Sequence, residues 1–162
     1  VATNAFFDAL GDRCVVGDLT GNGTLTNGVI AITGRLDAGT NGAPAGARMA
    51  VQNLSFVRGA TFACDWTTNA LGQVTNDFAT VTGALVPEGP GFFDLGRTAD
   101  NPIRMPFCAT VMSYGTFSNS FAGWKSINTG LPSGKMYATV VTASNGAITL
   151  TIRYCGTLLT IK

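Results

Sequence analysis

The sequence predicts an all-β fold, arranged as a two-sheet antiparallel sandwich or jelly roll. Runs of β-branched and aromatic residues alternate with turn signals at intervals of about ten residues, which is typical of sandwiches and barrels. Twenty-one glycines punctuate the 162 residues, and no linker divides the chain. A helical pattern finds little support, because only residues 3–10 could form a short turn capped by Thr3 or Asn4.

The clearest unit is a hairpin near the C-terminus. Residues 136–143 and 147–154 flank Asn145-Gly146, a pair that supplies the positive φ angles of a tight hairpin turn. Apolar and polar residues alternate strictly in the second arm, which indicates a half-buried strand. Residues 157–161 follow after a turn and complete a C-terminal three-strand meander.

The remaining strands are predicted from β-rich runs between turn signals. Arg58-Gly59 forms a tight joint between two of them, and the proline-bearing segments 87–91 and 101–102 are loop or edge, since proline cannot donate to a ladder. We expect about eight or nine short strands in a single domain, residues 1–162. The other predicted strands are residues 29–36, 48–57, 60–67, 78–86 and 104–113.

The low content of charged residues favours association of the chain with neighbouring molecules. Hydrophobic residues make up 46% of the chain and charged residues 12%, against a usual charged share of about 25%. Such a chain folds or packs against a partner, because disorder requires low hydrophobicity and high charge. The cores of protein–protein interfaces are depleted in charge, so a surface with few charges is compatible with a subunit that is buried in an assembly. The alternative is a rigid secreted monomer with an uncharged polar surface.

The sequence indicates neither a nucleic-acid partner nor a membrane span. The net charge is +1 and the ten basic residues are spread along the chain, whereas nucleic-acid binders cluster Lys and Arg to neutralise adjacent phosphates. No stretch of about 18 apolar residues occurs, so no membrane-spanning helix is expected.

The cysteines predict the compartment. Cys14, Cys64, Cys108 and Cys155 lack the paired spacing of zinc sites, and the chain has no histidine. Four widely spaced cysteines in a β-rich chain predict two disulfides and an extracellular or cell-surface location. We favour Cys14–Cys64 with Cys108–Cys155 among the three connectivities. The alternative is four buried free thiols.

No catalytic set is visible, and we predict neither an enzyme nor a cofactor. Without histidine the usual Ser–His and Cys–His pairs are absent. Paired carboxylates remain the one gap, because the aspartates lie mostly in apparent turns, where they usually bond their own backbone.

Residues 17–26 carry the sharpest motif. Asp18, Thr20, Asn22 and Thr24 occupy alternate positions with Gly23 at position six, so the segment resembles the start of the calcium loops of EF-hands and dockerins. That resemblance implies a weak metal site at Asp18, Thr20 and Asn22. It fails at position twelve, where Val29 replaces the bidentate glutamate, and the favoured interpretation is a Gly/Asn loop.

Two further features indicate contact surfaces. Trp124 lies in a glycine-containing segment and is predicted to be an exposed ligand contact for a sugar or a protein. Residues 1–10 form an apolar segment that packs on its own domain or adds as a strand to a neighbouring subunit, as in pilus-type polymers. The residues expected to make that contact are Val1, Ala5, Phe6 and Phe7.

Together these features predict a structural subunit of an extracellular filament, a surface coat or a virion shell, with copies of itself as partners. The alternative function is a secreted carbohydrate- or protein-binding β-sandwich of the adhesin or lectin kind, whose partner is a glycan or a surface protein.

Overall fold

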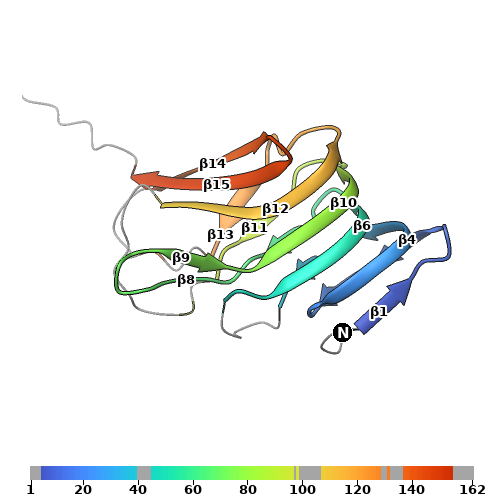
Figure 1. Cartoon of the computed structure of the whole chain (residues 1–162). Coiled ribbons are helices and arrows are strands. Elements are labelled where there is room, and N and C mark those ends of the chain that lie inside the picture. The colour runs from blue at the N-terminus through green and yellow to red at the C-terminus, as the bar shows by residue number, and fades with distance from the viewer. Residues whose placement is uncertain are drawn as a thin grey trace, which may run out of the picture.

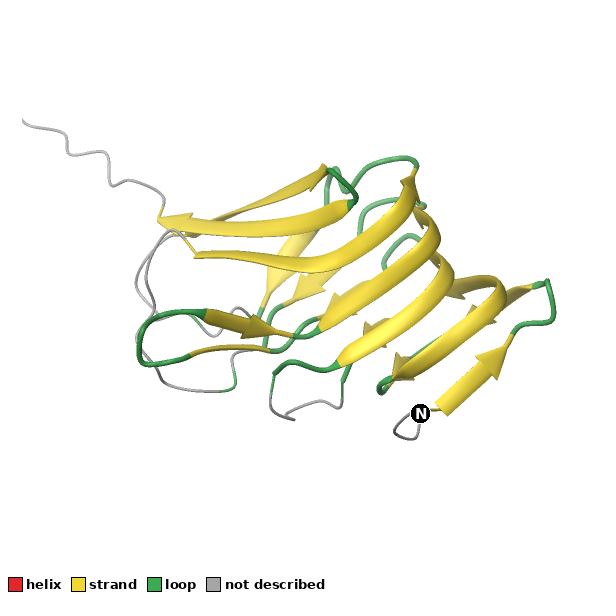
Figure 2. Cartoon of the chain, in the orientation of Figure 1, coloured by secondary structure: helices red, strands yellow, loops and turns green. Residues whose placement is uncertain are grey.

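The computed structural model describes residues 5–39, 45–96, 98, 107–128, 131 and 137–154. Every regular element in these ranges is a strand, which confirms the all-β prediction (Figure 2). In these ranges no helix is long and apolar enough to cross a membrane. The strands are β1 (Ala5–Asp8), β2 (Arg13–Val16), β3 (Leu19–Thr20), β4 (Gly23–Ile32), β5 (Arg35–Asp37), β6 (Arg48–Phe56), β7 (Thr61–Ala63), β8 (Trp66–Thr68), β9 (Val74–Asn76), β10 (Phe78–Pro87), β11 (Phe92–Asp94), β12 (Phe107–Phe117), β13 (Lys125–Ile127), β14 (Tyr137–Ser144) and β15 (Ala147–Tyr154).

The chain winds as a parallel β-solenoid. Strands β1-β4-β6-β10-β12-β15-β14, with β2 beside β4, form one sheet, here called sheet A. Strands β13-β11-β7-β5-β3 form a second sheet, sheet B. The chain visits the two sheets alternately, so that one strand of each makes a coil and successive coils stack (Figure 1). Each coil therefore buries its apolar side only against its neighbours, as in other solenoids.

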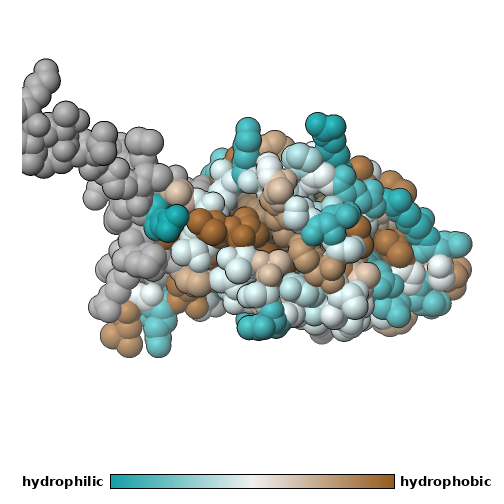
Figure 3. Space-filling view, turned by 90° about the horizontal axis from the view of Figure 1, so that it is seen from above, coloured by the Kyte–Doolittle hydropathy of each residue, from teal (hydrophilic) through white to brown (hydrophobic). Residues whose placement is uncertain are grey.

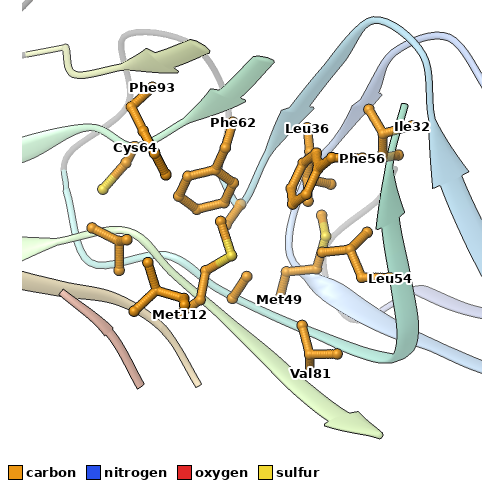
Figure 4. Close-up of a cluster of buried hydrophobic side chains, with 14 of the residues drawn as sticks. Ile32, Leu36, Met49, Leu54, Phe56, Phe62, Cys64, Val81, Phe93 and Met112 are labelled. Carbon is orange, nitrogen blue, oxygen red and sulfur yellow. The ribbon is translucent and has the colours of Figure 1, made fainter. Parts of the chain in front are cut away.

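Parallel stacking places equivalent residues above one another. In sheet B, Leu36 pairs in register with Phe62, and Phe62 with Phe93. In sheet A, Leu54 lies between Ile30 and Leu85. These inward-facing columns from both sheets meet in one apolar core (Figure 4).

The antiparallel sandwich or jelly roll is therefore not the architecture of this chain. The pairings of β4, β6, β10 and β12 with one another are all parallel. The predicted turn at Arg58-Gly59 exists, with Gly59 at a φ of 87°, but it is a corner that leads from β6 in sheet A to β7 in sheet B. A local turn signal does not distinguish a hairpin from such a corner, and this is why the sequence pattern predicted the wrong pairing.

The C-terminal hairpin is confirmed. Strands β14 and β15 pair antiparallel from Tyr137↔Tyr154 to Ser144↔Ala147. Asn145 and Gly146 have φ angles of 50° and 73°, as a type I′ turn requires. Strand β15 also pairs antiparallel with β12. The third strand predicted for the meander, residues 157–161, lies outside the described residues.

One insertion interrupts the winding. Strands β8 and β9 form a small antiparallel hairpin between β7 and β10, and this hairpin projects beside the solenoid (Figure 1). The predicted strand 60–67 is consequently divided into β7 and β8 by a corner at Cys64-Asp65.

Glu88 fastens the first coil to the corner after β10. Its Oε1 lies 2.7 Å from Nη2 of Arg13 on β2 and also accepts a hydrogen bond from the Ser55 hydroxyl on β6. The Ser55 hydrogen bond and the Arg13 charge outweigh partial burial and lower the pKa of Glu88 below its ordinary value of 4.5. A depressed pKa means that this contact stabilises the fold above the unfolded pKa, and that the gain is lost as pH falls through the folded one.

We therefore expect Glu88→Gln to flatten the acid limb of the stability profile below about pH 4.5. At neutral pH the loss should be under about 1 kcal/mol, because the pair is partly exposed. Urea unfolding across a pH series measures both effects, with Asp12→Asn at another exposed acid as the control. An acid limb in Glu88→Gln that matches the wild type would contradict the assignment.

Candidate functional site at the ends of the solenoid

The first coil leaves an open sheet edge. Strand β1 pairs with the first part of β4 and β2 with its second part, both parallel. Strand β3 ends sheet B in the same coil. Within the described ranges, no strand pairs with the outer edges of β1, β2 or β3. Unpaired edge groups of this kind are a template for another strand.

Apolar side chains gather at this edge. Phe6 is 68% exposed and Phe7 44% exposed, and Leu10 and Val15 are also exposed. These are four of the eight exposed large hydrophobic residues in the described part of the chain. Contiguous exposed apolar side chains mark interaction sites. A cavity of about 310 Å³ lies here and is lined by residues that include Phe6, Phe7, Cys14, Val16, Leu19 and Leu25.

The opposite end of the solenoid is also hollow and partly apolar. A cavity of about 430 Å³ lies between β14 and the segment that follows β12. Val140 on β14 is an exposed member of its wall. Seen from above, apolar side chains lie between hydrophilic ones on this side of the molecule (Figure 3). The lining includes Phe117, Phe121, Trp124, Val140 and Val141.

The two ends have matching strand directions. Strand β14 runs antiparallel to β15, and β15 runs antiparallel to β12. Because β12 is parallel to β10, β6, β4 and β1, β14 has the same direction as β1. A second molecule stacked on the first coil could therefore continue the parallel sheet.

Of the predicted assembly residues, Ala5, Phe6 and Phe7 lie at this edge. Phe6 and Phe7 lie in β1 and line its cavity, and Ala5 pairs in register with Gly23 of β4. Val1 lies outside the described residues. Strand β1 pairs with β4 of its own chain, so residues 5–8 dock in cis and form a strand instead of a capped helical turn.

Trp124 is not an exposed ligand contact. It is 9% exposed and belongs to the core. Its ring lies 4.9 Å from the rings of Phe93 and Phe121 and 5.3 Å from that of Phe56. Its Nε1 donates to the Gly89 carbonyl at 2.8 Å. The neighbouring Gly123, with a φ of 78°, lies in the turn that precedes Trp124.

The predicted Cys14–Cys64 disulfide is not formed, and Cys14, Cys64 and Cys108 are all unpaired. Cys14 lies on β2 in the first coil, whereas Cys64 follows β7 two coils away. Two inter-strand spacings of about 4.8 Å already exceed the Cα separation of about 7 Å that limits a disulfide. Cys64 is buried beside Phe93 (Figure 4), and this burial raises the pKa of its thiol. Cys155, the predicted partner of Cys108, lies outside the described residues.

The segment that resembles a calcium loop is divided between a corner, a strand and a turn. Asp18 lies in the corner between β2 and β3, Thr20 lies within β3, and Asn22 lies in the turn before β4. Asp18 Oδ1 accepts the backbone N–H of Arg35 at 2.8 Å, so this carboxylate fixes a corner between coils. In the described ranges, no three His, Cys, Asp or Glu side chains gather in a way that could hold a metal ion.

The sequence reasoning missed one charged cluster. Arg35 on β5 donates to Asp94 on β11, and its Nη2 lies 3.6 Å from Oδ2 of Asp37. The two carboxylates occupy equivalent positions of sheet B, with Ala63 between them in the register. Burial raises the pKa of Asp37, although the Gly39 N–H and Arg35 oppose the shift. Both carboxylates contact one arginine, so the cluster is an ion-pair network that joins β5 to β11.

No protein-family model matches the chain, and no curated protein is significantly similar to it.

Proposed function

We propose that the chain is a structural subunit that assembles with copies of itself by stacking solenoid ends head to tail. The carrying observation is the open edge of the first coil, where the exposed Phe6 and Phe7 flank an apolar cavity. The partly apolar end at β14, whose strand runs in the direction of β1, is the complementary surface. Edge hydrogen bonds would give the affinity, and the apolar side chains would give the register.

Head-to-tail stacking is a heterologous contact, which produces an open filament unless a rotation closes it. A filament is therefore the form that we favour over a coat or a virion shell. The extracellular location predicted from paired cysteines loses its Cys14–Cys64 support, and the assembly proposal does not depend on the compartment.

The test uses the native size of the whole chain. We expect the wild type to form elongated oligomers in light scattering and negative-stain microscopy. Phe6→Lys on the first coil and Val140→Lys on β14 should each weaken association at least about tenfold, because each places a charge in an apolar contact. Leu71→Lys is the matched control, since Leu71 is 69% exposed on the distant β8–β9 hairpin.

Mixing the two variants tests the head-to-tail arrangement directly. Phe6→Lys retains an intact β14 end, and Val140→Lys retains an intact first coil. Neither variant should polymerise alone, whereas an equimolar mixture should form dimers and stop there. A wild type that stays monomeric at high concentration would refute the proposal, and so would an equal loss of association in Leu71→Lys.

The alternative, a carbohydrate- or protein-binding module, loses the exposed Trp124 on which it was based. A trough on the outer face of sheet A supports it instead.

A further inference from the structure

The outer face of sheet A has an unusual charge distribution. Its strands β4, β6, β10, β12, β14 and β15 contain no Asp or Glu, and their only charged residues are Arg48 and Arg153. The buried acids Asp37, Asp65, Asp77 and Asp94 lie instead in sheet B or at corners. Over these six strands the outer face is therefore polar, rich in threonine and free of carboxylates, whereas the exposed Asp8 lies on β1 at the edge of the sheet.

Two hollows meet on this face at Arg48. One has a volume of about 530 Å³ and is bordered by β9, β10 and β12. The other has a volume of about 540 Å³ and extends toward β4 and Phe6. Arg48 and Thr80 line both hollows, so together they form one shallow trough across several strands. A trough of this form suits an extended chain better than a compact small molecule.

The Arg48 side chain is exposed and stacked on an aromatic ring. Its guanidinium carbon lies 4.8 Å above the centre of the Phe78 ring, and the side chain is exposed. The ion pairs of the described residues involve Arg13 and Arg35, and none involves Arg48. Stacking fixes the guanidinium plane and leaves its edge N–H groups to bind a carboxylate or sulfate.

The wall of the trough is also fixed in place. Asn76 on β9 donates from Nδ2 to the Thr110 carbonyl of β12 at 3.0 Å, which fastens the β8–β9 hairpin against the sheet. Thr80 and Thr110 line the trough beside Cys108. A wall that is already positioned reduces the entropy lost on binding.

We propose that this trough binds an acidic polysaccharide, with Arg48 contacting a carboxylate or sulfate and the threonine hydroxyls contacting sugar hydroxyls. Nucleic acid is disfavoured because its affinity requires several adjacent cations, and the trough offers one. Phe6 borders both this trough and the proposed assembly edge, whereas Arg48 lies on β6, which β4 separates from that edge, so substitution of Arg48 tests the trough without altering the assembly contact.

Titration calorimetry with trigalacturonate as the probe tests the proposal, with neutral maltotriose and a single-stranded DNA oligonucleotide for comparison. Only trigalacturonate should bind, and its affinity should fall with added salt. Arg48→Gln should weaken binding at least about tenfold, because it removes a charge-assisted hydrogen bond. Arg58→Gln is the matched control, since Arg58 is exposed and follows the far end of β6. Thermal unfolding shows that each variant folds.

Cys108 supplies a second measurement. It is exposed and lines the trough, whereas Cys64 is buried. Trigalacturonate should slow alkylation of Cys108 by iodoacetamide, and maltotriose should not. Mass spectrometry of the labelled peptide follows the rate, and Cys108→Ser identifies the signal. The proposal is overturned if trigalacturonate shows no binding, if Arg48→Gln leaves its affinity unchanged, or if maltotriose or DNA binds equally well.

Discussion

Replacing Arg35 with methionine should destabilise the fold by about 3 kcal/mol, because it leaves nearby carboxylates without their counter-charge in a buried site. The side chain of Asp37 is 2% exposed and that of Asp94 is 12% exposed, and both depend on Arg35. Arg35 itself is 29% exposed, so we expect the low end of the range for buried pairs. Urea unfolding at neutral pH measures the loss.

The pH dependence of the same variant gives a sharper signature. Arg35 opposes the burial that raises the pKa of Asp37, so without the arginine the pKa of Asp37 should rise further in the folded state. A carboxyl group whose pKa is raised in the folded state binds protons more readily in that state than in the unfolded chain. The stability that Arg35→Met loses relative to the wild type should therefore become smaller as the pH falls through the folded pKa. Arg58→Met at an exposed site should change stability by less than about 0.5 kcal/mol. An Arg35→Met variant with an unchanged midpoint would show that the network contributes nothing.

Trp124→Ala should cost about 3–5 kcal/mol, the usual loss for removing a large buried aromatic side chain. The indole packs against Phe56, Phe93 and Phe121 and donates to the Gly89 carbonyl. Truncation would leave both a cavity and an unpaired carbonyl. Chemical denaturation measures the loss, and Leu71→Ala on the exposed hairpin is the control.

This variant also separates the two interpretations of Trp124. As an exposed ligand contact, the side chain could be removed at little cost to stability. As a core residue, it could not. A loss below about 1 kcal/mol would contradict the core assignment.

The sequence determined the local structure well. The pattern placed strands at residues 48–57 and 78–86, and the structure has Arg48–Phe56 and Phe78–Pro87. Asn145-Gly146 located its hairpin turn because only a few residue types accept positive φ angles at both positions. Strand patterns and turn residues depend only on residues that are adjacent in the chain, so they can be recognised in a single sequence.

The tertiary structure alone decided how the strands pair and where side chains far apart in sequence meet. Alternation along a strand identifies the buried side but not the neighbouring strand, so corners between sheets resembled hairpins. Arg35 and Asp94 meet only because β5, β7 and β11 stack in register. Trp124 is buried for the same reason, since Phe56 and Phe93 reach it from different coils. All-β character therefore followed from the sequence, whereas the parallel solenoid, its open ends and its outer trough followed from contacts between coils.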